Sequence, residues 1–268
     1  MTAIFFKPNK SICGRIASVP RYADGPAHFC LIVNYVKMVV VEWESALTTG
    51  TTMAAGRFSN LLHGDAEARK QHDQVLLSHS DWVVAPTLGA IIPDWLIVIP
   101  RMRALSFRSW RAEQSKEPEA IIGKVRDHLG LASEDIIWFE HGPATHGSLV
   151  GCGTDYAHLH ILLKPNFPFE TFLRQGISMS SLSWAKTELE RAYASLPEET
   201  SYLLAGSGNQ AAWASQVDAT GSQFFRRVIA SLSKRPEGWD YRSHAHADNI
   251  SRTIETFREL ERDVQRGG

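Results

Sequence analysis

The sequence predicts an α+β fold, a largely antiparallel sheet with flanking helices. Two short apolar runs, residues 82–86 and 91–100, are separated by a Thr-Leu-Gly turn, the pattern of a hairpin of antiparallel strands. The segment 136–140 is rich in β-branched and aromatic residues, as strands are. The segments 117–129 and 246–264 place apolar residues at helical spacing. Predicted strands and predicted helices in one chain indicate a domain that contains both a sheet and helices.

In chain order the patterns predict one or two strands within 29–43, a helix over 65–78 with an Asp cap, the hairpin over 82–100, a helix over 117–129 ended by Gly130, strands over 136–140 and 157–163, a helix over 181–196, strands over 202–205 and 211–217, and helices over 222–232 and 246–264. The segment from 166 onward reads as a mostly helical extension packed on the preceding core.

Composition narrows the functional class. The chain has 268 residues, with 28 basic and 29 acidic side chains and a net charge of −1. This balance argues against a surface dedicated to nucleic acid or to an anionic membrane, so we expect neither partner. A hydrophobic fraction of 44% and a charged fraction of 21% are typical of a folded globular chain.

Cysteine usage and apolar runs predict the compartment. Cys13, Cys30 and Cys152 form no CxxC pair, which favours reduced thiols. The runs 31–43 and 90–100 are too short and too interrupted to span a membrane. The N-terminal segment reaches a lysine and a proline too early for a signal peptide. We therefore expect a cytoplasmic protein.

The most informative segment is 147–165, GSLVGCGTDYAHLHILLKP. Strand alternation places Tyr156, His158 and His160 on one face. The preceding Gly151-Cys152-Gly153 can turn backbone N–H groups toward an anion. Two imidazoles beside backbone N–H groups that bind an anion are suited to nucleophilic attack on phosphorus. One neutral ring attacks the phosphorus, and the other donates a hydrogen bond to the phosphate oxygens.

Two other interpretations of the same residues remain. A His-x-His pair on a strand can be a hydrogen-bonded structural pair. His158, His160 and Cys152 are also ligand types that zinc accepts, but their spacing matches no structural zinc pattern and a fourth ligand is not evident. We expect phosphate chemistry with no metal and no cofactor.

The segment 156–162 resembles the strand of the histidine-triad (HIT) superfamily of nucleotide hydrolases and transferases. That strand reads His-φ-His-φ-His-φ-φ, where φ is apolar, and here Tyr156 takes the place of the first histidine. The resemblance therefore makes Tyr156 a candidate catalytic residue together with His158 and His160. The segment 82–100 is similar to the family's hairpin. Phe139-Glu140 followed by Gly151-Cys152 is similar to a run in galactose-1-phosphate uridylyltransferases. The resemblance covers about residues 29–165.

The resemblance implies a HIT-like catalytic core over 1–165 and a C-terminal extension over 166–268, and it suggests a homodimer. It implies that His158 attacks the α-phosphorus of a nucleotide and forms a nucleotidyl-imidazole intermediate. His160 would hold and polarise the phosphate, and a histidine at this position favours the hydrolase branch. Residues Gly151, Cys152 and Gly153 would contact the phosphate.

Further residues are candidates for the same site. Arg103 stands near the position of a family histidine and can hold a phosphate bidentately. Glu140 would orient a histidine, bind a ribose hydroxyl or form a buried ion pair. His141 and His146 would assist proton transfer if their loop folds over the site, and are otherwise solvated.

A second cluster lies at 224–229 and 239–242, where paired arginines alternate with aromatic residues. It could bind a phosphate tail or stack on a base. The interpretation we favour for it is a helix packed through its aromatic residues with solvated arginines.

The predicted function is therefore hydrolysis of a nucleotide conjugate at its α-phosphate through a covalent intermediate on His158. One alternative is a nucleotidyltransferase that passes the group to phosphate or a sugar phosphate. The other is a nucleotide-binding module without catalysis.

Overall fold

The computed structural model describes residues 58–64, 67, 69–114, 118–152, 154–208, 211–217 and 222–267. The chain divides into two units, residues 1–54 and residues 55–268, and all of the described residues lie in the second. The strands expected within 29–43 lie outside the described residues.

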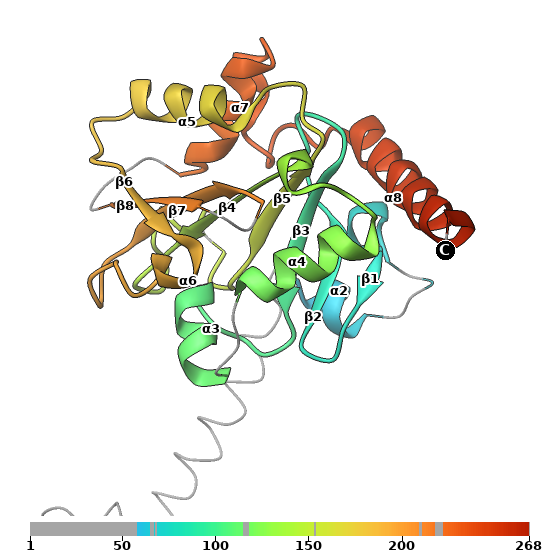
Figure 1. The fold of residues 1–268 in the computed structure, drawn as a ribbon, viewed down its shortest axis with the longest axis horizontal. Coiled ribbons are helices and arrows are strands. Elements are labelled where there is room, and N and C mark those ends of the chain that lie inside the picture. Colours follow the sequence, from blue (N-terminus) through green and yellow to red (C-terminus); the bar gives the residue numbers. More distant parts are fainter. Residues whose placement is uncertain are drawn as a thin grey trace, which may run out of the picture. The chain divides into compact units, whose positions relative to one another are not determined.

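Eight antiparallel strands form one sheet in the order β1-β2-β3-β5-β4-β7-β8-β6 (Figure 1). Their bounds are β1 Leu77–Ser78, β2 Trp82–Pro86, β3 Trp95–Pro100, β4 Ile136–Gly142, β5 Leu159–Leu163, β6 Ala185–Glu188, β7 Tyr202–Ser207 and β8 Ala211–Gln216. Because β7 pairs with β4, the sheet runs without a break across the boundary predicted at residue 165. The functional division at that boundary stays a prediction.

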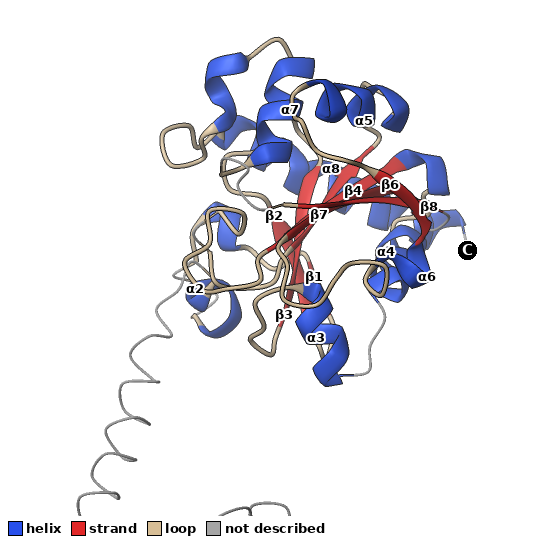
Figure 2. Cartoon of the chain, turned by 90° about the vertical axis from the view of Figure 1, so that its left-hand side faces the viewer, coloured by secondary structure: helices blue, strands red, loops and turns tan. Residues whose placement is uncertain are grey.

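Helices lie on both faces of this sheet. Figure 2 shows α5 and α7 on one side, and α3, α4 and α6 on the other. The helices are α2 Ser59–His63, α3 Phe107–Gln114, α4 Pro118–His128, α5 Phe169–Ser178, α6 Leu189–Ala192, α7 Phe224–Leu232 and α8 Ala247–Gly267, with short 3-10 turns at Gln71–Asp73, Ser133–Asp135 and Pro236–Trp239. The predicted α+β class, an antiparallel sheet flanked by helices with a helix at the C-terminal end, is confirmed.

Strand alternation divides the core between the two faces. One face packs Val98 and Leu159 against α3, α4 and α8. The opposite face carries two smaller clusters, one under α2 that includes Ile97 and one under α5 and α7 that includes Phe139. In the sheet register His160 pairs with both Ile97 and Phe139, so it lies between those two clusters.

Most predicted elements are confirmed within a few residues: the 82–100 hairpin, the helix ended at Gly130, the strands near 136, 157, 202 and 211, and the last two helices. Gly130 has a φ of +60°, as a residue that ends a helix commonly does.

Two predicted helices are wrong. In 65–78 the described residues form a 3-10 turn and β1, because Leu77 and Ser78 pair with β2. In 181–196 the first half forms β6, which pairs with β8, and only the short α6 is helical. Helices α3 and α5 were not predicted. No helix in the described part of the chain combines the length and apolarity that a membrane crossing requires.

Candidate functional site

Three imidazoles gather on the face of the sheet that carries α2, α5 and α7. His160 lies in β5 and His158 directly precedes that strand, and both are buried. Their ring centroids are 5.1 Å apart and their planes nearly perpendicular, at 86°. His141, in the neighbouring strand β4, is also buried, and its ring centroid is 6.4 Å from that of His160. The common face predicted for His158 and His160 is therefore present.

Hydrogen bonds give His158 and His160 opposite tautomers when both rings are neutral. Nδ1 of His158 lies 2.8 Å from the carbonyl oxygen of Tyr156. A carbonyl only accepts, so this Nδ1 carries the hydrogen and Nε2 carries the lone pair. Nδ1 of His160 accepts from the indole N–H of Trp95 at 3.1 Å. Its hydrogen is therefore on Nε2.

Burial keeps His160 neutral. Its pKa is held well below the ordinary value by loss of hydration, and the nearby His158, His141 and Arg226 lower it further. At neutral pH the ring is therefore an N–H donor without a charge.

His141 has a fixed tautomer as well. Its Nε2 accepts from the backbone N–H of Phe225 at 3.2 Å, so the hydrogen is on Nδ1. Among the described residues this Nδ1 has no hydrogen-bond partner. Burial, followed by the charge of His158, lowers the pKa of His141 to about 3.

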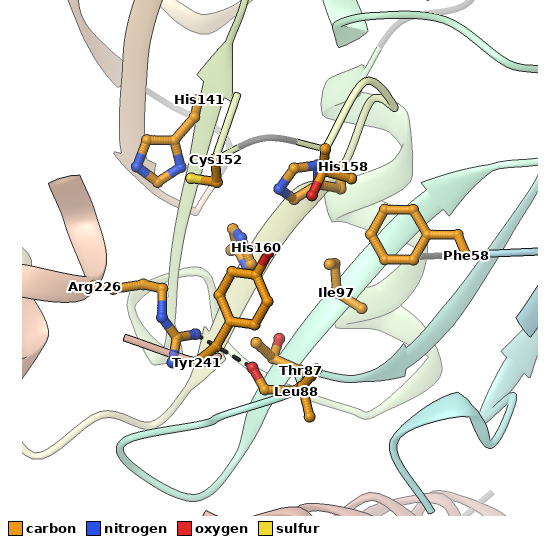
Figure 3. A pocket seen from close by; sticks show the side chains of 11 residues that line it. Phe58, Thr87, Leu88, Ile97, His141, Cys152, His158, His160, Arg226 and Tyr241 are labelled. Atoms are coloured by element: carbon orange, nitrogen blue, oxygen red, sulfur yellow. Dashed lines mark hydrogen bonds between the residues drawn. The ribbon is translucent and has the colours of Figure 1, made fainter. Parts of the chain in front are cut away.

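The three histidines open on one cavity of about 40 Å³ (Figure 3). It is lined by Phe58, Thr87, Leu88, Ile97, His141, Cys152, Thr154, His158, His160, Arg226 and Tyr241. A single water needs roughly 10–15 Å³ on this measure, so the cavity has room for a small group such as a phosphoryl. The hydroxyl of Thr87 is buried in this wall without a hydrogen-bond partner among the described residues.

Arg226 of α7 is the permanent cation of the cavity wall. The favoured interpretation of a solvated arginine is wrong for this residue, because its side chain is only 3% exposed. Its guanidinium lies over the Trp95 ring, 4.9 Å from the centroid, and donates to the carbonyl oxygens of Trp239, Leu88 and Gly89. Burial lowers its pKa to about 10, so it stays charged at neutral pH.

Tyr156 belongs to the margin of the site. Its hydroxyl lies 3.1 Å from the carbonyl oxygens of both Pro100 and Arg101, to which it donates, and its ring packs edge-on against Phe58. It does not line the cavity. Burial raises the pKa of the Tyr156 phenol above its ordinary value.

Glu140 lies on the opposite face of the sheet. It pairs in register with Leu159, and its carboxylate accepts from the Phe107 backbone N–H and from the hydroxyls of Tyr193 and Tyr202, each at 2.8 Å. Alternation explains the separation, since neighbours in a strand point to opposite faces. Glu140 therefore has no contact with the histidine cavity and is not part of the proposed site.

Arg103 and His146 are also apart from the cavity. Both line a second depression, with Asp155, and Nδ1 of His146 lies 3.3 Å from a carboxylate oxygen of Asp155. Arg103 lies in the loop after β3, beyond the sheet that holds the histidines. The cation beside the histidines is Arg226.

The glycine-rich loop contributes less than expected. Cys152 lines the cavity with a φ of 60°, but its backbone N–H donates to the carbonyl of Leu149 and so is not directed at a ligand. Gly151 is not part of the cavity wall, and Gly153 lies outside the described residues. In the described segments no group of three or more His, Cys, Asp or Glu side chains is arranged to hold a metal ion.

Sequence reasoning missed Thr87 and Trp95. It grouped Arg226 and Tyr241 in the second cluster, for which binding of a phosphate tail or a base was the less favoured interpretation. Thr87 was read only as part of a turn. Trp95 was read only as part of a strand. Their part in the site follows from the pairing of β3 with β5 and from the packing of α7, neither of which leaves a local pattern.

No family model matches the chain, and a search of curated proteins finds no match. Among solved structures, a HIT-like protein involved in cell-cycle regulation from Bartonella henselae, with an unknown ligand, is similar at 16% identity. The match covers 43% of this chain and 85% of that one, with a TM-score of 0.26. At this TM-score and identity the likeness carries no argument.

Proposed function

We propose that the chain is a HIT-like enzyme that hydrolyses a nucleotide conjugate at its α-phosphate through a covalent intermediate on His158. The observation that carries this proposal is the pair of opposite tautomers. His158 directs a lone pair through Nε2, and His160, whose ring centroid is 5.1 Å away, carries a hydrogen on the same atom. A nucleophile beside a fixed donor is the arrangement that attack on a phosphoryl group needs.

The reaction proceeds in two balanced steps. In the first, Nε2 of His158 forms a bond to the α-phosphorus while the bond from phosphorus to the leaving group breaks, and the leaving group takes the electron pair. In the second, water attacks phosphorus and the N–P bond returns its pair to Nε2. The water proton passes to solvent. The Tyr156 carbonyl, 2.8 Å from Nδ1, stabilises the positive charge that the ring carries in the intermediate.

Space in the site fits this assignment. The cavity of about 40 Å³ admits the reacting phosphoryl group, so the nucleoside and the leaving group extend beyond it. Neutral His160 and charged Arg226 line the same cavity, where they would face the non-bridging oxygens.

The test is turnover of a panel of dinucleoside polyphosphates, phosphoramidates, adenylyl sulfate and nucleotide sugars, with and without added phosphate. His158→Ala should abolish turnover, and the matched control His146→Ala, in the second depression, should retain it. Wild-type protein quenched during turnover should carry one acid-labile nucleotidyl group on the peptide that contains His158.

Wild-type turnover without that adduct, together with an active His158→Ala variant, would exclude the covalent mechanism. Nucleotide binding with no turnover of any conjugate would identify a binding module instead. A product that changes when phosphate is added would identify a transferase.

A further inference from the structure

Two polar atoms in the wall of the histidine cavity have no hydrogen-bond partner among the described residues. They are Oγ1 of Thr87 and Nδ1 of His141. Both side chains are nearly inaccessible, at 2% and 3% exposure, and both line the cavity. Buried polar atoms in folded proteins are nearly always hydrogen-bonded. Two such atoms in one cavity therefore mark positions that ordered water or a polar ligand would occupy.

Arg226 adds a charge to the same wall. It carries five N–H groups, of which Nε, Nη1 and Nη2 each give one to a main-chain carbonyl. No salt bridge to Arg226 forms among the described residues. A buried charge is strongly destabilising unless a counter-charge accompanies it. The carboxylate of Asp240 acts on Arg226 electrostatically but does not line the cavity. The described cavity wall therefore presents a buried positive charge with no acidic side chain of its own.

The hydrogen-bond donors that line the cavity indicate which kind of ligand would bind there. Arg226 only donates, His141 carries its hydrogen on Nδ1, and a threonine hydroxyl can donate. No acidic side chain belongs to the described residues that line the cavity. Several convergent donors with one permanent positive charge fit a tetrahedral oxyanion better than a neutral or cationic group.

We propose that Arg226, His141 and Thr87 form an oxyanion subsite that binds a phosphate group, and that the C-terminal part of the chain completes the site by supplying the arginine. The statement that this subsite holds the phosphate of the substrate rests on the proposed function. As a site for inorganic phosphate it does not, because none of the three residues forms or breaks a covalent bond in the proposed reaction.

Binding of inorganic phosphate to the full chain, measured by titration calorimetry, tests the subsite. Arg226→Met should weaken phosphate binding roughly tenfold to hundredfold, the effect expected for a lost hydrogen bond to a charged group. Arg103→Met and Arg227→Met remove equivalent arginines outside the cavity wall and should bind phosphate as the wild type does.

Thr87→Val provides a second measurement that does not depend on Arg226→Met folding. Removing a hydroxyl that has no partner in the ligand-free protein should leave its melting temperature unchanged or raised, while phosphate binding weakens roughly tenfold. A merely structural hydroxyl would show the reverse, a lower melting temperature with unchanged binding.

Three results would overturn the subsite: a wild-type protein that binds neither phosphate nor sulfate at millimolar concentration, a folded Arg226→Met variant with unchanged affinity, or a Thr87→Val variant with unchanged affinity. A competition arm separates the two sources of the phosphate. If a nucleoside monophosphate displaces inorganic phosphate, the subsite holds the substrate. If phosphate binds and the nucleotide does not compete, the subsite stands and the proposed function fails.

Discussion

The indole N–H of Trp95 donates to Nδ1 of His160 at 3.1 Å, and the same indole ring lies 4.9 Å beneath the guanidinium of Arg226. One buried tryptophan therefore fixes the tautomer of His160, which we propose donates a hydrogen bond to phosphate. The same ring positions Arg226, which we propose binds the phosphate through its positive charge. Trp95 lies in β3, paired in register with Leu162 of β5, so its ring joins His160 of the sheet to Arg226 of α7.

Trp95→Phe should therefore impair the site through His160. Without the indole N–H, either nitrogen of the neutral His160 ring can carry the hydrogen, and Nε2 is no longer committed to donating. We expect turnover to fall roughly tenfold and stability to fall by about 1–3 kcal/mol, because a buried acceptor loses its partner. Nitrogen-15 NMR of the imidazole should show a mixture of tautomers in place of one.

Trp138→Phe is the matched control. Trp138 is also fully buried, and its indole N–H donates to the Gly208 carbonyl at 2.8 Å, but it packs on the face of the sheet away from the histidines. It should cost similar stability and leave the His160 tautomer unchanged. Equal effects of the two variants on the His160 spectrum would contradict the assigned role of Trp95.

Sequence alone identified the parts of the site that depend on neighbouring residues. The shared face of His158 and His160 follows from the two-residue period of a strand, which needs no knowledge of the fold. The 82–100 hairpin was likewise predicted from its own turn and apolar runs. Glu140 and His141 are the informative contrast, because alternation separates them but only pairing with β5 determines which of the two faces His160.

The remaining parts depend on contacts between distant segments. Arg226 donates to the Leu88 carbonyl across 138 positions of the chain, and no local pattern predicts such a contact. The strand β6 is similar: residues 185–188 are largely exposed, and their extended conformation follows from pairing with β8. Pairing with β8 therefore outweighs the local pattern that predicted a helix over 181–196.

Glu140→Gln should change how stability depends on pH. Burial raises the pKa of this carboxyl from 4.5 to about 7, so the folded protein holds a proton that the unfolded chain releases. The Glu140 contribution is therefore most favourable below pH 4.5 and is lost as pH rises toward 7, by roughly 3 kcal/mol in full. In urea unfolding from pH 5 to pH 8, the unfolding free energy of the Gln variant should rise relative to that of the wild type. Parallel stability curves would contradict this.

Tyr156→Phe should leave catalysis largely intact. The phenol donates to main-chain carbonyls outside the cavity, so it is not placed to protonate a leaving group. The variant should lose about 1 kcal/mol of stability from the hydrogen bond. Its turnover should fall far less than the roughly hundredfold or more expected on removing a general acid.

The same absence of an acid at Tyr156 should appear as substrate selection. Conjugates whose leaving groups depart as stable anions, such as phosphate or sulfate, should turn over faster at neutral pH than alkylamine phosphoramidates, which need a proton. Comparable rates for both classes would show that another group supplies the proton.

Acid should destabilise the protein through His141. Its pKa is about 3 in the folded protein against 6.5 for an ordinary histidine, so below pH 6.5 the unfolded chain binds a proton that the folded one excludes. The contribution is complete above pH 6.5 and is lost as pH falls toward 3, with roughly 2 kcal/mol gone by pH 5. His160, whose pKa is also lowered, acts in the same direction.

His141→Gln isolates this contribution, because a glutamine oxygen can still accept from the Phe225 N–H but does not titrate. Between pH 7.5 and pH 5 the variant should lose about 2 kcal/mol less unfolding free energy than the wild type in urea titrations. His146→Gln, which replaces a loop histidine that is 69% exposed, should follow the wild-type curve. If His141→Gln and wild type lose the same free energy, His141 ionises without cost in the folded protein, and its neutral Nδ1–H cannot serve the phosphate subsite as assigned.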